Sequence, residues 1–203
     1  MAKKATKSTK APQSSGFAAR YGHLLTIDRV IIGGSVLLAL ILIGVFALNA
    51  SQNSPVEIEG VVRSVGLARD HQENVTYPNT GLPPVGGTHN PVWMNCGIYD
   101  TPVRTDMAVH SLEHGSVWLT YQPDLPAEQV QQLRDLARGK DHVLLSPFPG
   151  LKSPVVATAW GLQLELPDTS DSRLAAFVRN YANGPQTPEP GAACSGGFGQ
   201  PIA

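Results

Sequence analysis

The sequence predicts an α+β protein with one N-terminal transmembrane helix, followed by a single small domain that has a β-α-β-β-α core and a long loop rich in glycine and proline. Three observations support this prediction. Residues 30–50 contain no charged side chain. The second half of the chain alternates between strand-like and helix-like periods of apolar residues. Between these parts lies a stretch dense in Gly, Pro and Asn.

The apolar run from Val30 to Ala50 is long enough to cross a bilayer, because a helix of this length spans about 31 Å. A buried core helix is one alternative, yet core helices seldom run so far without a polar face. A cleaved signal peptide is the closer alternative. Its apolar region is normally only about 7–15 residues long, and the small residues that mark a cleavage site match Leu48-Asn49-Ala50 poorly. We therefore expect an uncleaved, single-pass membrane anchor.

Charge is distributed unevenly around this run. Before residue 30 the chain has one anionic side chain, Asp28, against six cationic ones: Lys3, Lys4, Lys7, Lys10, Arg20 and Arg29. This segment therefore carries +5, and since the whole chain carries −1, the remainder carries −6. Cationic flanks stay in the cytoplasm, which predicts a C-terminal domain outside the cytoplasm at the cell membrane. The tail has few interleaved aromatic residues, so we expect no nucleic-acid partner.

These patterns divide the chain into five parts. We expect a basic cytoplasmic tail at 1–29, a transmembrane helix at 30–50, a linker at 51–57, an extracytoplasmic α+β domain at 58–183 and a Pro/Gly-rich C-terminal tail at 184–203. The first part of the tail, Met1–Gly16, has no apolar period and is expected to be disordered.

Apolar periodicity predicts the elements of the domain. The expected strands are Ser116–Tyr121, His142–Ser146 and Val155–Leu166, with a weaker signal over Val56–Val65. The expected helices are Pro126–Gly139 and Ser170–Ala182, packed on the sheet. The segment Tyr77–Asp100 has too many Gly, Pro and Asn residues for regular structure and too many aromatic residues for a linker. It is predicted to be an ordered functional loop.

The two cysteines, Cys96 and Cys194, are predicted to form a disulfide, because the domain is expected in an oxidising compartment. Such a bond encloses about 100 residues, and the chain-entropy model predicts that it stabilises the folded protein by roughly 4–5 kcal/mol. It would also attach the tail to the loop around Trp93. One alternative is that Cys96 is a thiolate metal ligand, with Met94 as a thioether ligand. Another is that both thiols are inert.

Histidines carry the chemistry that the sequence suggests. His110 and His114 are four residues apart, which places both imidazoles on one face of a helical turn. His89 supplies a third nitrogen and His71 is a further candidate, so the pattern predicts a copper or zinc site. Glu113 is expected behind the ligands, where it orients an imidazole. The alternative is a non-enzymatic module with structural histidines, whose acidic surface meets another envelope protein.

The same turn reads His110-x-x-Glu113-His114, which is the order of the inverted zinc-protease motif. In those enzymes the motif lies inside a longer helix, whereas Gly115 ends this helix after two turns at most. Hydrolysis is therefore disfavoured, and no catalytic residue is assigned. The sequence contains no Walker or dinucleotide-binding glycine motif. A blue-copper site is disfavoured because no histidine follows Cys96 closely.

Two segments, PPVGGTHNPVWMNCGIYD and AVHSLEHGSVWLTYQPDLP, resemble the bacterial Domain of Unknown Function 3105 (DUF3105) family. The resemblance covers most of Ile58–Cys194 and implies an N-terminal anchor or signal followed by this domain. It implies no activity. The family motifs, Gly-x-His-Asn, Trp-x-x-Cys-Gly-x-Tyr and His-Ser-Leu-Glu-His-Gly, fall on His89, Trp93, Cys96, Gly97, Tyr99, His110, Glu113, His114 and Gly115.

Overall fold

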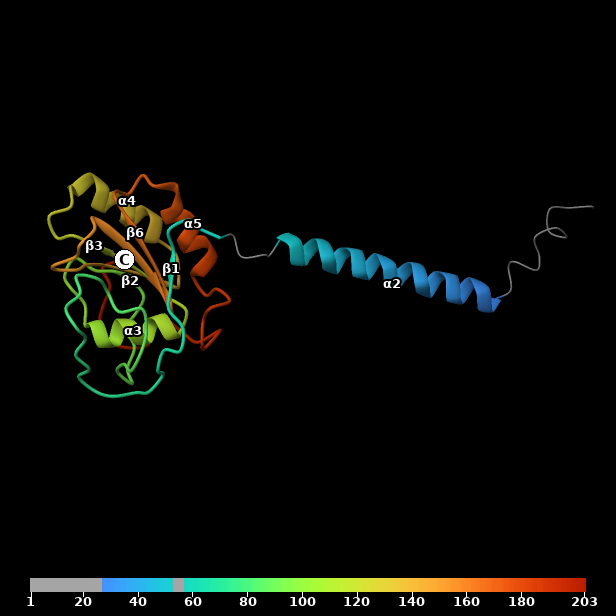
Figure 1. Cartoon of the computed structure of the whole chain (residues 1–203), viewed down its shortest axis with the longest axis horizontal. Helices are drawn as coiled ribbons and strands as arrows, with labels where there is room; N and C mark the ends of the chain where they lie inside the picture. Colours follow the sequence, from blue (N-terminus) through green and yellow to red (C-terminus); the bar gives the residue numbers. More distant parts are fainter. Residues whose placement is uncertain (1–26, 53–56) are drawn as a thin grey trace, which may run out of the picture. The chain divides into compact units, whose positions relative to one another are not determined.

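The computed structural model describes residues 27–52 and 57–203 (Figure 1). Within these ranges, four helices and a mixed six-stranded sheet confirm the predicted α+β class. The chain divides into two compact units, and the second begins at Pro55. The expected disorder of Met1–Gly16 and the greater part of the expected linker lie outside the described residues.

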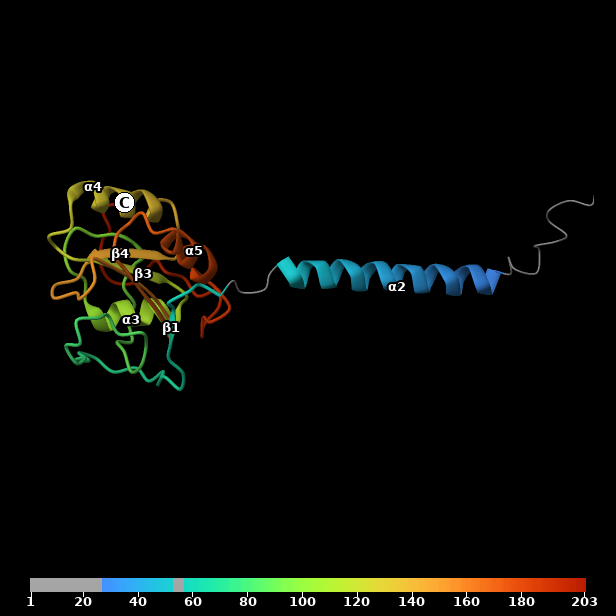
Figure 2. The ribbon, with the colours of Figure 1, turned by 45° about the horizontal axis from the view of Figure 1, so that its top comes forward.

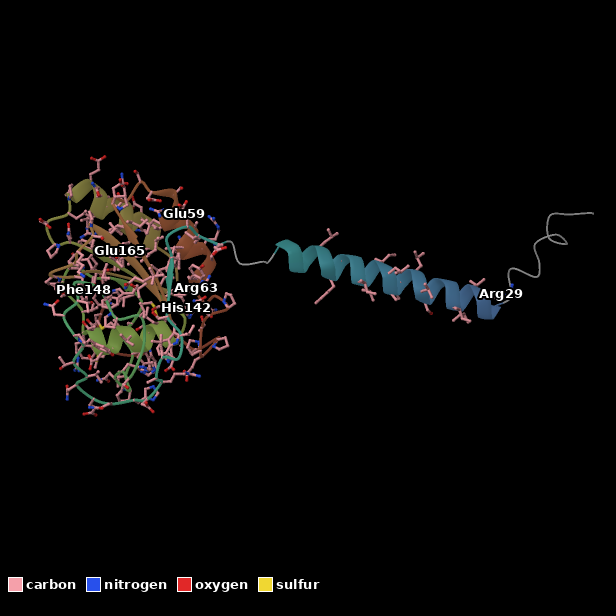
Figure 3. All side chains as sticks on the ribbon, viewed as in Figure 1. Arg29, Glu59, Arg63, His142, Phe148 and Glu165 are labelled. Atoms are coloured by element: carbon pink, nitrogen blue, oxygen red, sulfur yellow. A yellow bond between two sulfur atoms is a disulfide. The ribbon has the colours of Figure 1, made fainter. Side chains whose placement is uncertain are left out.

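The first unit contains helix α2, Ile27–Gln52, which includes the whole predicted apolar run. Its segment Arg29–Phe46 is long and apolar enough to cross a membrane, and none of it is buried. The described apolar side chains are exposed along the helix, up to 75% for Phe46, and Arg29 lies at its N-terminal end (Figure 3). A helix that is apolar all round suits a membrane span or a signal sequence.

The second unit is built on a sheet of order β1-β6-β5-β3-β4-β2. Its strands are β1 (Val62–Arg63), β2 (Gly97–Ile98), β3 (Val117–Tyr121), β4 (Val143–Pro147), β5 (Val155–Ala159) and β6 (Leu162–Leu166). Strands β3 and β4 are parallel and are joined through helix α4, Ala127–Ala137. Strand β2 is parallel to β4 at one edge, whereas β5, β6 and β1 continue antiparallel from β3.

The segment Val155–Leu166 is two strands, not the single strand that its apolar pattern predicted. The chain reverses at Trp160 and Gly161, since Ala159 pairs with Leu162. Gly161 has φ of +70°, which glycine adopts without strain. Both strands are buried at almost every position, so the apolar run continues through the turn without a polar break. Of the weak strand signal over Val56–Val65, only β1 forms a strand.

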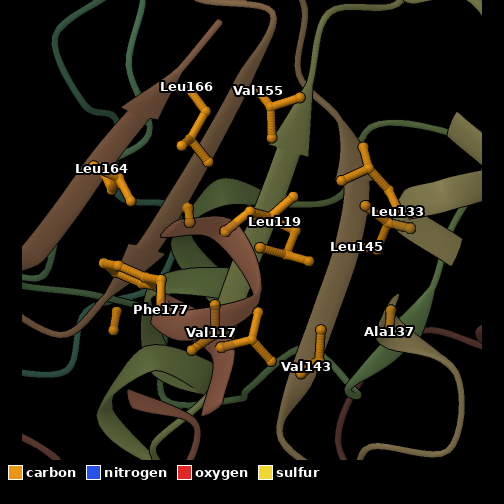
Figure 4. Packing of buried hydrophobic residues seen from close by; sticks show 14 of the residues in the cluster. Val117, Leu119, Leu133, Ala137, Val143, Leu145, Val155, Leu164, Leu166 and Phe177 are labelled. Carbon is orange, nitrogen blue, oxygen red and sulfur yellow. The ribbon is translucent and has the colours of Figure 1, made fainter. Parts of the chain in front are cut away.

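Helices cover both faces of the sheet (Figures 1 and 2). Helices α4 and α5 (Ser172–Tyr181) pack on one face, and α3 (Thr105–Glu113) packs on the other. Because side chains alternate along a strand, Leu119 of β3 belongs to the α4 and α5 side while Trp118 belongs to the α3 side. The core on the first side includes Leu133, Val143, Leu145, Leu164 and Phe177 (Figure 4).

Helix α3 is enclosed on all sides, since every residue from Asp106 to Glu113 is buried. The chain beyond α5 closes over the C-terminal end of this helix. Asn183 N donates to Gly115 O at 2.7 Å, and Glu189 N donates to Glu113 O at 3.1 Å. The tail therefore packs against the part of α3 that carries the His-Ser-Leu-Glu-His-Gly motif.

The two cysteines lie at disulfide distance, in agreement with the predicted pair. Their Cα atoms are 5.3 Å apart, and Cys96 N donates to Cys194 O at 2.7 Å. The bond joins the C-terminal tail to the segment that leads into β2. A cysteine in this bond has no thiolate to offer as a metal ligand.

Gly115 should be essential for stability because it combines a positive φ with close packing. Its φ is +97°, and an added Cβ would lie 2.9 Å from Thr187 Oγ1 and 3.1 Å from Asn183 Cα. We expect Gly115→Ala to lower the free energy of unfolding by about 2–4 kcal/mol. Gly139→Ala is the matched control, because Gly139 has φ of +70° with open space around it, and should cost only about 1 kcal/mol. Urea unfolding of both variants in detergent measures the difference, and equal losses would contradict the close packing of the tail.

A candidate metal centre

Four side chains from separate parts of the domain meet beside helix α3. Donor atoms of His71, His89, His110 and Glu113 all lie within 4.8 Å of one another. The side chain of His71 is 43% exposed, whereas the other three residues are buried. Three imidazoles and one carboxylate thus share a small volume that opens toward solvent at His71.

Two features of the fold, a helix turn and a β-bridge, bring these residues together. On α3, His110 and Glu113 are three residues apart and therefore face the same side of the helix. The two loop histidines meet through an isolated β-bridge between His71 and His89. In this bridge His89 N donates to Asp70 O at 3.0 Å, and Gln72 N donates to His89 O at 2.7 Å.

The contact between His89 and Glu113 is unusual for two buried polar groups. Nδ1 of His89 lies 2.7 Å from Gly87 O, and because a carbonyl only accepts, Nδ1 carries the proton. When the ring is neutral, Nε2 has a lone pair, and it lies 2.9 Å from Glu113 Oε2. Neither atom has a hydrogen-bond partner in the described structure. Two acceptors facing each other at this distance repel unless a proton or a cation lies between them.

A second pair of the same kind joins His110 and His114, whose Nε2 atoms are 3.0 Å apart. Nδ1 of His110 lies 2.6 Å from Asn90 O, and Nδ1 of His114 lies 2.7 Å from Ala193 O. Both Nδ1 atoms therefore donate, which leaves two Nε2 lone pairs directed at each other in the neutral state. This pair also requires a shared proton or a cation.

A proton is poorly accommodated at His110. The pKa of His110 is lowered to about 4, chiefly by burial; the Asn90 carbonyl opposes this change, and the neighbouring imidazoles of His114, His89 and His71 add to it. Two indole rings add to the apolar surroundings. The ring centroid of Trp93 lies 4.8 Å from that of His114, and the centroid of Trp160 lies 5.8 Å from that of His89.

Glu113 is held in its charged form. Burial by itself would raise the pKa of Glu113, but the hydrogen bond from Arg69 and the positive charge nearby lower it overall. Arg69 Nε donates to Glu113 Oε1 at 2.7 Å, which leaves Oε2 directed into the histidine group. The Glu113 carboxylate oxygen therefore lies within 4.8 Å of the histidine nitrogens, whereas the sequence had suggested a position behind the ligands.

The structure brings the predicted ligands His71, His89 and His110 together, and it places the side chains of Cys96 and Met94 elsewhere. His114 touches the group through His110, and its Nε2 is also 3.5 Å from Glu189 Oε2. Cys96 is in the disulfide, and Met94 is buried in the second hydrophobic cluster, where its side chain lies against Gly199.

Arg69 was missed by the sequence reasoning, because no short-range pattern links it to Glu113, 44 positions further along. The same holds for the exact partners of the imidazole Nδ1 atoms, which are main-chain carbonyls. Ser111 has a structural role, since its Oγ donates to Met94 O at 2.6 Å and so fastens α3 to the loop.

Fold and site together define a protein with one apolar N-terminal helix and an α+β domain that encloses a buried His/Glu cluster beside a disulfide. The chain belongs to the family described as "Protein of unknown function (DUF3105)", whose model matches residues 69–196. The matched range contains every residue of the cluster and both cysteines. No curated protein and no solved structure matches the chain.

The low pKa of His110 predicts that acid destabilises the metal-free protein. Between about pH 6.5 and the folded pKa of about 4, the unfolded chain binds a proton that the folded chain does not, so stability falls as pH drops through this window. The loss should reach at most about 3 kcal/mol, and Glu113, whose pKa is lowered from 4.5, adds a further loss once the pH falls to about 4.5.

Urea unfolding of chelator-treated protein at several pH values measures this loss. His110→Asn should flatten the dependence above about pH 4.5, because no imidazole remains to titrate at this position. His142→Asn is the control, because His142 lies outside the group and its ring lies at hydrogen-bond distance from the carbonyl of Ala192. An unchanged slope in His110→Asn would contradict the assignment.

Proposed function

We propose that this protein is a membrane-anchored protein whose extracytoplasmic domain binds one divalent transition-metal ion, zinc or cupric copper, through His71, His89, His110 and Glu113, with His114 against His110. The main support for the proposal is two buried contacts between acceptor atoms. His89 Nε2 lies 2.9 Å from Glu113 Oε2, and the Nε2 atoms of His110 and His114 are 3.0 Å apart. Only a proton or a cation between the two atoms removes their repulsion. A metal ion satisfies several lone pairs at once, whereas protonation of His110 is opposed by burial.

The donor atoms are close to the spacing that a metal requires. A tetrahedral zinc ion with ligand bonds of about 2.0–2.2 Å places its donor atoms roughly 3.3–3.5 Å apart. In the structure His89 Nε2 and Glu113 Oε2 are 2.9 Å apart, His71 Nε2 and Glu113 Oε2 are 3.6 Å apart, and the whole group spans 4.8 Å. Small side-chain rotations are therefore enough to form a site.

Main-chain carbonyls prepare the imidazoles for this role. Metal-bound histidines usually donate their other ring N–H to a carbonyl or carboxylate, which fixes the tautomer and the ring orientation. The Nδ1 atoms of His89, His110 and His114 all lie within 2.7 Å of a carbonyl oxygen, those of Gly87, Asn90 and Ala193. The free Nε2 atoms are thereby presented as ligands.

The donor set favours a divalent ion over cuprous copper. Cuprous copper prefers thiolate and thioether sulfur, and neither Cys96 nor Met94 belongs to the group. Imidazole nitrogen suits zinc and cupric copper, and one anionic carboxylate reduces the net charge of a divalent centre. Glu113 Oε1 is bound by Arg69, and Oε2 is within the donor group, so no oxygen of this carboxylate is free to act as the base of a zinc hydrolase.

Membrane attachment and topology are part of the same proposal. Helix α2 has the length and composition of a span, the preceding segment is basic, and the disulfide suits an oxidising compartment outside the cytoplasm. If no metal binds, we infer the alternative role, in which the domain is an envelope interaction module and its histidines are structural.

Metal uptake by the untagged full chain in detergent, measured after chelator treatment, tests the site. We expect the wild type to bind one zinc or cupric ion, and His110→Ala to bind at least about 100-fold more weakly, because loss of a direct ligand should exceed the 10–100-fold effect of losing an outer partner. His142→Ala is the matched control and should bind as the wild type does. Bound metal should also raise the midpoint of thermal unfolding in a concentration-dependent way.

A different outcome would favour the structural role of the histidines. This would be the case if the wild type takes up neither ion at micromolar concentration while His110→Ala unfolds at lower temperature without any metal. The histidines would then serve to hold the loop against α3, and the domain would be an interaction module.

The topology predicts a specific pattern of protease sensitivity in a bacterial host. Protease added to intact spheroplasts should digest the C-terminal domain and spare an epitope attached at the N-terminus, because the basic segment stays inside. Detergent-permeabilised spheroplasts serve as the control, in which both ends are digested. A domain protected in intact spheroplasts would reverse the proposed orientation.

A further inference from the structure

The disulfide lies beside a cavity that is separate from the histidine group. The cavity has a volume of about 440 Å³, and both Cys96 and Cys194 line it. Polar residues form part of its wall, among them Lys140, His142 and Ser195. A small dithiol, or the dithiol of a protein that inserts a loop, would meet the bond there.

The residues that precede Cys194 contact the metal centre. The carbonyl of Ala193 accepts the hydrogen bond that fixes His114 Nδ1, at 2.7 Å. Four positions earlier, Glu189 approaches His114 Nε2 to 3.5 Å with its side chain and donates its main-chain N–H to Glu113 O. The position of Cys194 thus determines where the outer partner of His114 lies.

Apart from the main chain itself, the disulfide is the only covalent link between this part of the tail and the rest of the described domain. Residues 184–194 contain no helix or strand. Beyond the bond, Asn95 holds the tail by side-chain hydrogen bonds to Gly197 and Gly199, and Met94 forms a β-bridge with Phe198. Near the bond, the carbonyls of Ala192, Ala193 and Cys194 lie at hydrogen-bond distance from the rings of His142 and His114 and from the main-chain N of Cys96, so the disulfide acts together with these contacts.

We propose that the Cys96–Cys194 disulfide is a reducible latch on the metal centre, opened by a dithiol that enters this cavity; the proposal rests on the metal binding proposed above. One thiolate of the dithiol attacks a protein sulfur, a mixed disulfide forms, and the other cysteine leaves as a thiolate. The second thiol of the dithiol then attacks the mixed disulfide, closes its own disulfide and releases the second cysteine. Two electrons pass from the dithiol to the protein, and the two thiol protons of the dithiol become available to the cysteine thiolates.

The surroundings of the bond favour this exchange. A nearby cation stabilises a thiolate, and Lys140 lines the cavity together with both cysteines. Once the bond opens, hydrogen bonds alone hold the segment that carries the Ala193 carbonyl, so His114, whose Nε2 faces that of the ligand His110 at 3.0 Å, is fixed less firmly. Loss of an outer contact around metal-bound histidines weakens metal binding by about 10–100-fold.

The test compares zinc affinity of the full chain in detergent in three forms. These are the oxidised wild type, the wild type reduced with a phosphine and alkylated, and the Cys96→Ser/Cys194→Ser double variant. Alkylation and serine both prevent freed thiolates from binding zinc themselves. We expect the two forms without the bond to bind zinc about 10–100-fold more weakly than the oxidised form.

Two single variants separate the steps. Asn95→Ala should loosen residues 197–199 but leave the disulfide and zinc affinity unchanged, because its contacts lie beyond the bond. Lys140→Gln should slow reduction by dithiothreitol several-fold without changing zinc affinity. Lys152→Gln is its matched control, since Lys152 is exposed and lies outside the cavity.

Each outcome bears on a different claim. If the oxidised protein binds no zinc, the proposed function fails and the latch fails with it. If the oxidised and bond-free forms bind zinc equally, the latch alone is overturned and the metal site stands. If dithiothreitol reduces the bond only after urea is added, a dithiol does not reach it in the folded protein, and the latch is likewise overturned.

Discussion

The hydrogen bonds from imidazole Nδ1 atoms to main-chain carbonyls are the interactions on which the centre depends. They fix three rings in one tautomer: His89 and His110 belong to the donor group, and the Nε2 of His114 faces that of His110 at 3.0 Å. Each carbonyl belongs to a segment without regular structure, those around Gly87, Asn90 and Ala193. The glycine- and proline-rich loop and the tail are therefore parts of the site, because their main-chain oxygens determine which nitrogen of each histidine is free.

The fold serves this arrangement by surrounding α3. The sheet face that carries Trp118 lies on one side of the helix, and the loop and the tail close the others. A helix buried along its whole length, with two histidines and a glutamate at its end, is costly unless these groups find partners. Gly115 permits the abrupt exit from the helix, since its positive φ and missing side chain leave room for Thr187. Stability and site geometry thus depend on the same few contacts.

The sequence predicted those parts of the molecule that depend on local pattern. Helices α4 and α5 were found because their apolar residues recur at helical spacing, and β3 and β4 because short apolar runs are bounded by turns. The break at Gly161 was missed because the residues directly beside it, Ala159, Trp160 and Leu162, are apolar and no polar turn residue marks it. Within the site, His110 and His114 were found from their spacing. The role of Arg69 depends on a contact across 44 positions that no local pattern encodes.

The electrostatic balance of the group argues that its polar residues are more than a structural network. A network that only stabilises the fold would pair each buried acceptor with a donor, because an unpaired buried polar atom costs about 1–3 kcal/mol. Here Asn90 and Asp106 show such pairing, with an amide donor on a carboxylate at 2.9 Å. Only a few residues away, His89 Nε2 and Glu113 Oε2 face each other with no hydrogen bond. Both oxygens of Asp106 accept hydrogen bonds, from Asn90 and Arg104, whereas Oε2 of Glu113 is directed at lone pairs, which is the arrangement expected where a cation supplies the missing partner.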